Sequence, residues 1–146
     1  MQVLENELFR VEIDPMGAEL CSMKSKKTGT EYVWQADPAV WKRHAPILFP
    51  IVGRLKDLTF TAAGKPYKIT QHGFGRDLMW QVGSAGDDYV EFVLEASDKT
   101  REMYPWDFVC TVRYTRTGAT LKKEHITMNR SDTDMDYGVD GHDAYT

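Results

Sequence analysis

Apolar and polar side chains alternate along most of this chain, a pattern typical of half-buried β-strands. The clearest case is residues 108–114, where Phe108, Cys110, Val112 and Tyr114 occupy every second position. Alternation or short apolar runs of this kind mark residues 9–13, 17–26, 31–35, 58–60, 67–69, 80–82, 90–96 and 120–128. Glycine-bearing turns separate many of these short segments, so the sequence predicts an all-β sandwich or barrel.

Helical patterns are scarce, and only residues 37–42 and 98–104 could form a helical turn. Residues 45–55 break the alternation in a different way. They are apolar at nearly every position, and Pro46 and Pro50 interrupt them.

Residues 71–77 read Gln-His-Gly-Phe-Gly-Arg-Asp and predict a polar, glycine-rich loop between two strands. A loop dense in histidine, arginine and aspartate on a β scaffold is a common place for a functional site. The alternative is a tight turn whose charged side chains face water. The residues alone leave both interpretations open.

Length and charge limit the functional classes. With 146 residues the chain is expected to form a single domain over residues 1–146. Its 18 Lys and Arg against 22 Asp and Glu give a net charge of −4, which provides no general attraction to nucleic acid or anionic lipid. The longest uncharged apolar run, residues 45–53, is too short to cross a bilayer.

The two cysteines and the N-terminus indicate the compartment. Cys21 and Cys110 stand far apart with no paired spacing, which suits two free thiols in a reducing environment. The first ten residues lack the basic and apolar regions of a secretory signal. We therefore expect a cytoplasmic protein that binds neither nucleic acid nor membranes.

Motifs for phosphate-binding loops and for a nucleophile elbow are missing from the sequence. The four histidines, at positions 44, 72, 125 and 142, do not have the spacing of zinc ligands. We expect neither a metal nor another cofactor. His125 alternates with Lys123 and Thr127, so we expect it on the exposed face of a strand.

One set of side chains is suited to a sugar. Aromatic faces match the apolar side of a pyranose, while arginine, aspartate and histidine can bind its hydroxyls. The polar candidates are Arg54, His72, Arg76, Asp77 and His142. The aromatic candidates are Trp34, Trp41, Trp80 and Trp106, although a tryptophan in a β protein is more often a core residue.

Taken in order, several segments resemble the galactose mutarotase (aldose 1-epimerase) superfamily, and more closely its LacX-like branch. The most specific are Pro-Ile-Val-Gly-Arg-Leu at residues 50–55 and His-Gly-Phe-Gly-Arg-Asp at residues 72–77. The other matching stretches are Gly17–Leu20, Glu31–Trp34, Trp41, Ala45–Phe49, Tyr104–Phe108 and Tyr137–His142. The resemblance extends over essentially the whole chain and agrees with the all-β prediction.

The resemblance implies a galactose mutarotase-like β-supersandwich that binds an aldohexose on a concave face. Family enzymes interconvert the α and β anomers of an aldose without a cofactor, by acid–base catalysed ring opening. By motif match, His142 corresponds to the general acid and His72 to a substrate-binding or charge-stabilising histidine. Arg54, Arg76 and Asp77 are the implied substrate-binding residues.

The chain also departs from the family pattern. Family members are roughly twice as long, so the resemblance implies the N-terminal half of a truncated supersandwich. The family's general base is a glutamate near the C-terminus of the full domain, and Glu95, Glu102 and Glu124 do not match its position. We therefore expect an aldose 1-epimerase-like isomerase with little activity in this chain alone.

Two other functions stay open. A non-catalytic sugar-binding protein would keep the concave face without the chemistry. A hexose-6-phosphate mutarotase would use Arg54 and Arg76 to meet a phosphate. In each case, half a sandwich should leave a strand edge and an apolar face uncovered, so we expect a homo-oligomer, most simply a dimer.

Overall fold

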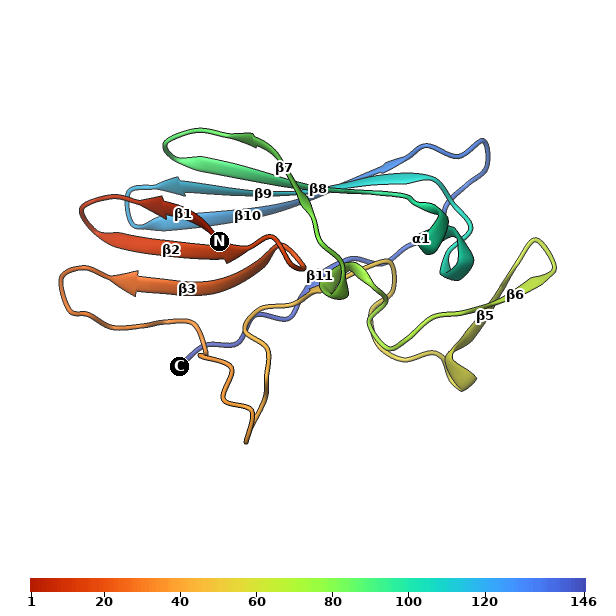
Figure 1. The fold of residues 1–146 in the computed structure, drawn as a ribbon, viewed down its shortest axis with the longest axis horizontal. Helices are drawn as coiled ribbons and strands as arrows, with labels where there is room; N and C mark the ends of the chain where they lie inside the picture. The colour runs from red at the N-terminus through yellow and green to blue at the C-terminus, as the bar shows by residue number, and fades with distance from the viewer.

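The computed structural model describes residues 1–146 and consists mostly of antiparallel strands (Figure 1). One sheet has three strands in the order β1-β2-β3 and another has four in the order β10-β9-β8-β7. The strands of the first sheet are β1 (Gln2–Glu5), β2 (Phe9–Asp14) and β3 (Glu19–Ser25). Those of the second are β7 (Gln81–Ala85), β8 (Tyr89–Glu95), β9 (Phe108–Thr117) and β10 (Thr120–Asn129).

The two sheets share one hydrophobic core. Val11 and Ile13 of β2 are buried in the same cluster as Phe92 of β8 and Val112 of β9. The Tyr114 hydroxyl of β9 also donates a hydrogen bond of 2.9 Å to the Ala18 carbonyl beside β3. Removal of these apolar faces from water stabilises the pairing of the sheets. The predicted all-β, mutarotase-like fold class is confirmed.

A hairpin and a short helix extend this body. Strands β5 (Thr59–Ala62) and β6 (Lys65–Lys68) form the hairpin that projects at one end of Figure 1, after the 3₁₀ turn η1 (Lys56–Leu58). Helix α1 (Asp98–Met103) begins at a capping box formed by Ser97 and Thr100. It lies within the segment 98–104 predicted from the sequence. No helix of the chain has the length and apolar character needed to span a bilayer.

Two very short strands meet near the middle of the molecule (Figure 1). Strand β4 (Ile47–Leu48) pairs with β11 (Asp140–Gly141) in antiparallel register. Immediately after β4, Phe49 forms a parallel bridge to Gly73, which precedes the 3₁₀ turn η2 (Gly75–Asp77). Three segments that lie far apart in the sequence therefore converge here.

The structure corrects one local prediction and agrees with another. Residues 31–35 make only isolated bridges, because the Glu31 carboxylate itself accepts the amide protons of Met23 and Val33. Residues 37–42 agree with the prediction of a helical turn, because amides 40 and 41 both donate to the Asp37 carbonyl, and no regular helix follows.

His125 also differs from its prediction. It lies on the half-buried face of β10, and its Nδ1 is buried without a hydrogen-bond partner. The alternation along β10 was interpreted correctly, but the face that carries His125 is turned toward the protein. Burial, followed by the charge of Lys123, lowers the pKa of this histidine.

Candidate functional site

The candidate site lies where β4, β11 and the loop before η2 meet. The loop contributes His72, and the residue after β11 is His142. Their ring centroids are 6.2 Å apart and the rings are inclined at 62°. The structure therefore brings together the two histidines that the sequence marked as catalytic candidates.

His142 is exposed and has an aromatic neighbour. Its ring centroid is 5.1 Å from the ring of Trp41. Its backbone amide donates to the Pro46 carbonyl over 3.0 Å, which continues the β4–β11 pairing by one step. The backbone is therefore fixed while the imidazole stays open to a ligand.

His72 is held more tightly. Its amide donates to the Gly53 carbonyl over 2.8 Å, and its Nδ1 accepts the Gly53 amide proton over 2.9 Å. Since Nδ1 is an acceptor, the neutral ring carries its proton on Nε2. Nε2 lies 3.2 Å from the side-chain nitrogen of Gln71. Two donors cannot pair, so a protonated Nε2 requires the Gln71 amide to be turned with its oxygen toward the ring.

The surroundings of His72 favour its neutral form. Burial lowers the pKa of His72, and the positive charges of Arg76 and His142 lower it further. At neutral pH the His72 imidazole is therefore neutral and donates a hydrogen bond through Nε2.

The backbone beside His72 is unusually crowded. Gly73 has φ +71°, and a Cβ atom there would overlap the carbonyl group of Phe49. Phe49 is fully buried and its ring contacts those of Phe74 and Phe108. Glycine at position 73 thus lets the histidine loop lie directly on the aromatic core.

Arg76 and Asp77 belong to a second cluster, together with Arg43. The Arg43 Nη2 donates to Asp77 Oδ1 over 2.6 Å, and the Arg76 Nη2 donates to the Gln71 carbonyl over 2.8 Å. The Arg76 Nε is 3.9 Å from Asp77 Oδ2 and has no hydrogen-bond partner. The Asp77 carboxylate therefore lies beside two guanidinium groups. Burial lowers the pKa of Arg76, and the charge of Arg43 lowers it further.

The remaining candidates have different positions. Arg54 is exposed on the loop that follows Gly53, where its side chain can meet a ligand. Trp80 is a core residue, only 1% exposed, with its indole N–H donating to the Gly75 carbonyl. Trp106 stacks on Phe60 of the projecting hairpin, at 6.3 Å between centroids.

Two residues of the Gly17–Leu20 segment contact the parts of the chain that form the site. A Cβ at Gly17 would lie 2.8 Å from the Arg76 carbonyl oxygen, so this glycine allows close contact with η2. The buried Glu19 carboxylate accepts the amide protons of His44 and Ala45 over 2.6 and 2.9 Å. Glu19 therefore anchors the chain just before β4.

Sequence reasoning did not single out Arg43, Gln71 and Glu19. Arg43 stands two residues after Trp41, but its partner Asp77 is far along the chain. Gln71 precedes His72 in the matched loop, and this position could have marked it as a candidate. Trp41 is one of four tryptophans, and only the structure shows that its ring lies beside His142.

The cysteines are unsuited to nucleophilic chemistry. Cys110 is buried, Cys21 is half-buried and both are free. Burial raises the pKa of each thiol to about 11. Both therefore stay protonated at neutral pH, whereas the reactive form of cysteine is the thiolate.

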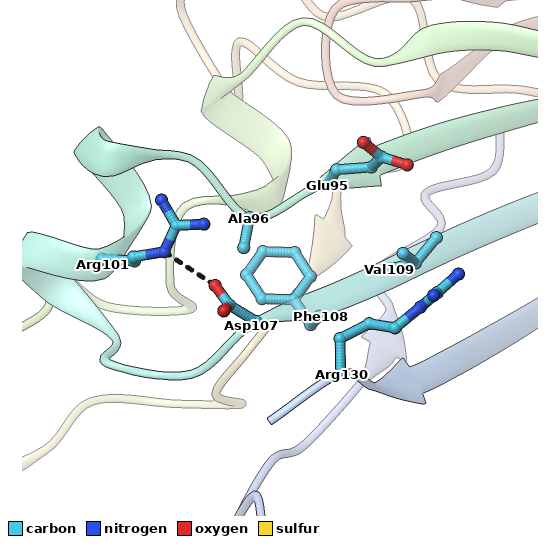
Figure 2. Close-up of a pocket in the computed structure, with 7 residues that line it drawn as sticks. All are labelled: Glu95, Ala96, Arg101, Asp107, Phe108, Val109 and Arg130. Carbon is cyan, nitrogen blue, oxygen red and sulfur yellow. Dashed lines mark hydrogen bonds and ion pairs between the residues drawn. The ribbon is translucent and has the colours of Figure 1, made fainter. Parts of the chain in front are cut away.

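A pocket of about 400 Å³ lies elsewhere, where β8 ends and β9 begins (Figure 2). Its charged side chains are Glu95, Arg101, Asp107 and Arg130, and it contains neither His72 nor His142. Arg101 is already paired, with its Nε 2.7 Å from Asp107 Oδ1. The volume alone does not make this pocket the sugar site, because it has no exposed aromatic face beside its polar groups.

Comparison with known proteins identifies the family. The family model "Aldose 1-epimerase" matches residues 1–144. Protein LacX, chromosomal, from Lactococcus lactis subsp. lactis is 32% identical over 148 aligned residues, which cover 97% of this chain and 49% of the relative.

Two solved structures agree with this match. The galactose mutarotase related enzyme from Lactobacillus acidophilus is 40% identical and superposes with a TM-score of 0.97, covering 99% of this chain and 48% of that one. A galactose mutarotase-like protein from Lactobacillus casei is 33% identical with a TM-score of 0.96, covering 99% and 49%. This chain spans about half the length of the relatives it matches, and the resemblance expected from the motifs is confirmed. The chain belongs to the aldose 1-epimerase family.

Proposed function

We propose that this chain binds an aldose between His72, His142 and Trp41, and that the site serves the family reaction, the interconversion of α and β anomers. The observation that carries the proposal is the pair of imidazole rings, 6.2 Å apart, with the Trp41 ring 5.1 Å from His142. Two polar rings beside an aromatic face suit the hydroxyls and the apolar side of one pyranose.

The reaction needs two proton transfers. A base takes the proton of the anomeric hydroxyl while an acid protonates the ring oxygen, and the bond between C1 and the ring oxygen breaks to give the open-chain aldehyde. After rotation about the C1–C2 bond, the two groups exchange roles and the ring closes. Histidine can act in both directions near neutral pH.

The environment of each histidine favours a different role. His142 is exposed and is free to approach the ring oxygen, so we assign it the general acid. His72 has a lowered pKa and its donor on Nε2, so we assign it a hydrogen bond to a sugar oxygen that takes the place of Gln71 as its partner. Arg54, Arg76 and Asp77 border the same loops and would contact the sugar hydroxyls.

Most carboxylates near the site have partners. Asp77 is paired with Arg43, and Asp143 with Lys123. Asp140 accepts the following amide proton, and Glu19 accepts two. Asp140 alone has no ionic partner, and none of these carboxylates matches the family's glutamate base. We therefore expect sugar binding with slow turnover, and a non-catalytic binding protein is the alternative.

Polarimetry on freshly dissolved α-D-glucose and α-D-galactose tests the assignment, together with sugar titrations. His72→Ala and His142→Ala should abolish sugar binding while circular dichroism stays unchanged. His125→Ala, which removes a histidine of β10, is the control and should bind as the unchanged chain does. Equal effects from all three variants would contradict the assignment.

A hexose-6-phosphate is the second candidate substrate. The observation that favours it is the excess positive charge of the Arg43, Arg76 and Asp77 cluster beside His72. Arginine is well suited to phosphate oxygens. Glucose 6-phosphate should then compete with glucose, and Arg43→Met should remove that advantage while leaving glucose binding in place.

We further propose that the chain forms a dimer and works in the cytoplasm. Strand β10 lies at the end of its sheet, and it exposes Ile126 and Met128. An unpaired strand edge with apolar side chains favours association with a second copy. Both free thiols suit a reducing compartment.

A further inference from the structure

Lys123 is a nearly buried lysine beneath the segment that carries His142. Its side chain is 13% exposed, and its Nζ lies 2.9 Å from Oδ1 of Asp143, which is 26% exposed. The Nζ also lies 5.9 Å from the centroid of the Tyr114 ring, directly across the β9–β10 ladder. An ion pair with so little exposure is screened less than a surface pair.

The geometry of the His142 segment links this pair to the site. In an extended chain, successive side chains point to opposite sides. A Cβ at Gly141 would lie 3.1 Å from the Lys123 Nζ, so Gly141 and Asp143 both face β10. His142, between them, faces the opposite way, toward Trp41 and His72.

Backbone bonds hold this segment to two other parts of the chain. The His142 amide donates to the Pro46 carbonyl, and the Ala144 amide donates to the His44 carbonyl, each over 3.0 Å. The Ala144 carbonyl also accepts the Trp34 amide proton over 2.9 Å. The backbone of Asp143 makes none of these bonds, so its side-chain bond to Lys123 is what holds this residue against the sheet.

We propose that Lys123 is a positioning residue for His142 and acts through the carboxylate of Asp143. The ion pair fixes the tilt of the segment, and the tilt aims the His142 imidazole at the space beside Trp41. The proposal rests on the role given to His142 above, but its first test needs no sugar.

The charged groups near the Lys123–Asp143 pair determine the pH at which the test should be done. His125 lies two residues from Lys123 on the same face of β10, and Asp140 and Asp143 both face it. A protonated His125 could replace the lysine as the partner of Asp143. Measurement at about pH 8 keeps His125 neutral, because its pKa is already lowered by burial and by Lys123.

The test measures NMR cross-relaxation between the His142 and Trp41 rings, followed by titration with D-glucose. In Lys123→Met the contacts between these rings should disappear, and the affinity for D-glucose should fall about tenfold. Lys123→Arg should restore both. The matched control is Lys122→Met, which removes an exposed ion pair to Glu124 on the other face of β10 and should change neither.

A single variant leaves one charge unpaired and could unfold, so a second variant removes both charges. Lys123→Met combined with Asp143→Leu should keep the fold and still lose the contacts between His142 and Trp41. Retained contacts in the folded Lys123→Met or in the double variant would overturn the proposal. Equal losses in Lys122→Met would also overturn it. If the unchanged chain binds no D-glucose, the proposed function fails, and the ring contacts still decide the role of Lys123.

Discussion

Gly53 and His72 are joined by two hydrogen bonds that run in opposite directions. The His72 amide donates to the Gly53 carbonyl, and the Gly53 amide donates to Nδ1 of the imidazole. Protonation of Nδ1 would turn one of these bonds into a clash between two donors. The pair therefore ties the protonation state of a site residue to the shape of the loop that carries Arg54.

The pKa of His72 should depend on Arg76. Burial lowers this pKa, and the nearby Arg76 guanidinium lowers it further, so Arg76→Gln should raise it. NMR titration of the imidazole checks this directly. Arg54→Gln is the control, because Arg54 does not contribute to the shift and should leave the titration curve in place.

The same shift predicts how stability varies with pH. The folded-state pKa values of His72 and His125 are both below the unfolded value of about 6.5. In this window the unfolded chain binds more protons, so the free energy of unfolding should fall as pH drops below about 6.5. Urea unfolding at several pH values should show a shallower fall in His72→Gln combined with His125→Gln. An unchanged slope would contradict the two shifts.

Gly73→Ala should destabilise the fold far more than Gly64→Ala. Both glycines have similar positive φ angles, +71° and +76°, so each alanine pays the left-handed penalty of about 1–2 kcal/mol. A Cβ at position 64 meets open space, whereas one at position 73 meets the Phe49 carbonyl and Pro50. This overlap should cost about 1–3 kcal/mol more. Equal free energies of unfolding would show that the His72 loop does not rest on the core as described.

Association should depend on the exposed apolar residues of β10. A charge at Ile126 or Met128 opposes pairing at this edge, so Ile126→Lys and Met128→Lys should shift the chain toward the monomer. Light scattering after size-exclusion chromatography measures the change. Val40→Lys places the same charge at another exposed apolar residue and should have no effect. A chain that is monomeric without any substitution would contradict the proposed dimer.

The long strands could be predicted from the sequence because every second side chain of a half-buried strand faces the core and is apolar. Strand β9 shows this most clearly, with Phe108, Cys110, Val112 and Tyr114 all buried. The short strands β4 and β11 show no such alternation. Two residues are too few to show a period, and the pairing of Leu48 with Asp140 depends on contacts between distant parts of the chain.

Motifs can mark candidate site residues, but they do not show how those residues lie in space. The motifs marked His72 and His142, yet their approach to within 6.2 Å depends on the β4–β11 pairing. The ion-pair partners could not be predicted either, because they also lie far apart in the sequence. Nothing in the local sequence connects Arg43 with Asp77, or Lys123 with Asp143.

The most direct test of the sugar site is an NMR titration of all four histidine rings with D-glucose and D-galactose. The proposed site predicts saturable shifts of the His72 and His142 signals with one common affinity. His44 and His125 lie outside the ring pair and serve as internal controls whose signals should stay in place. Unchanged His72 and His142 signals, or equal shifts of all four rings, would contradict a sugar site at this position.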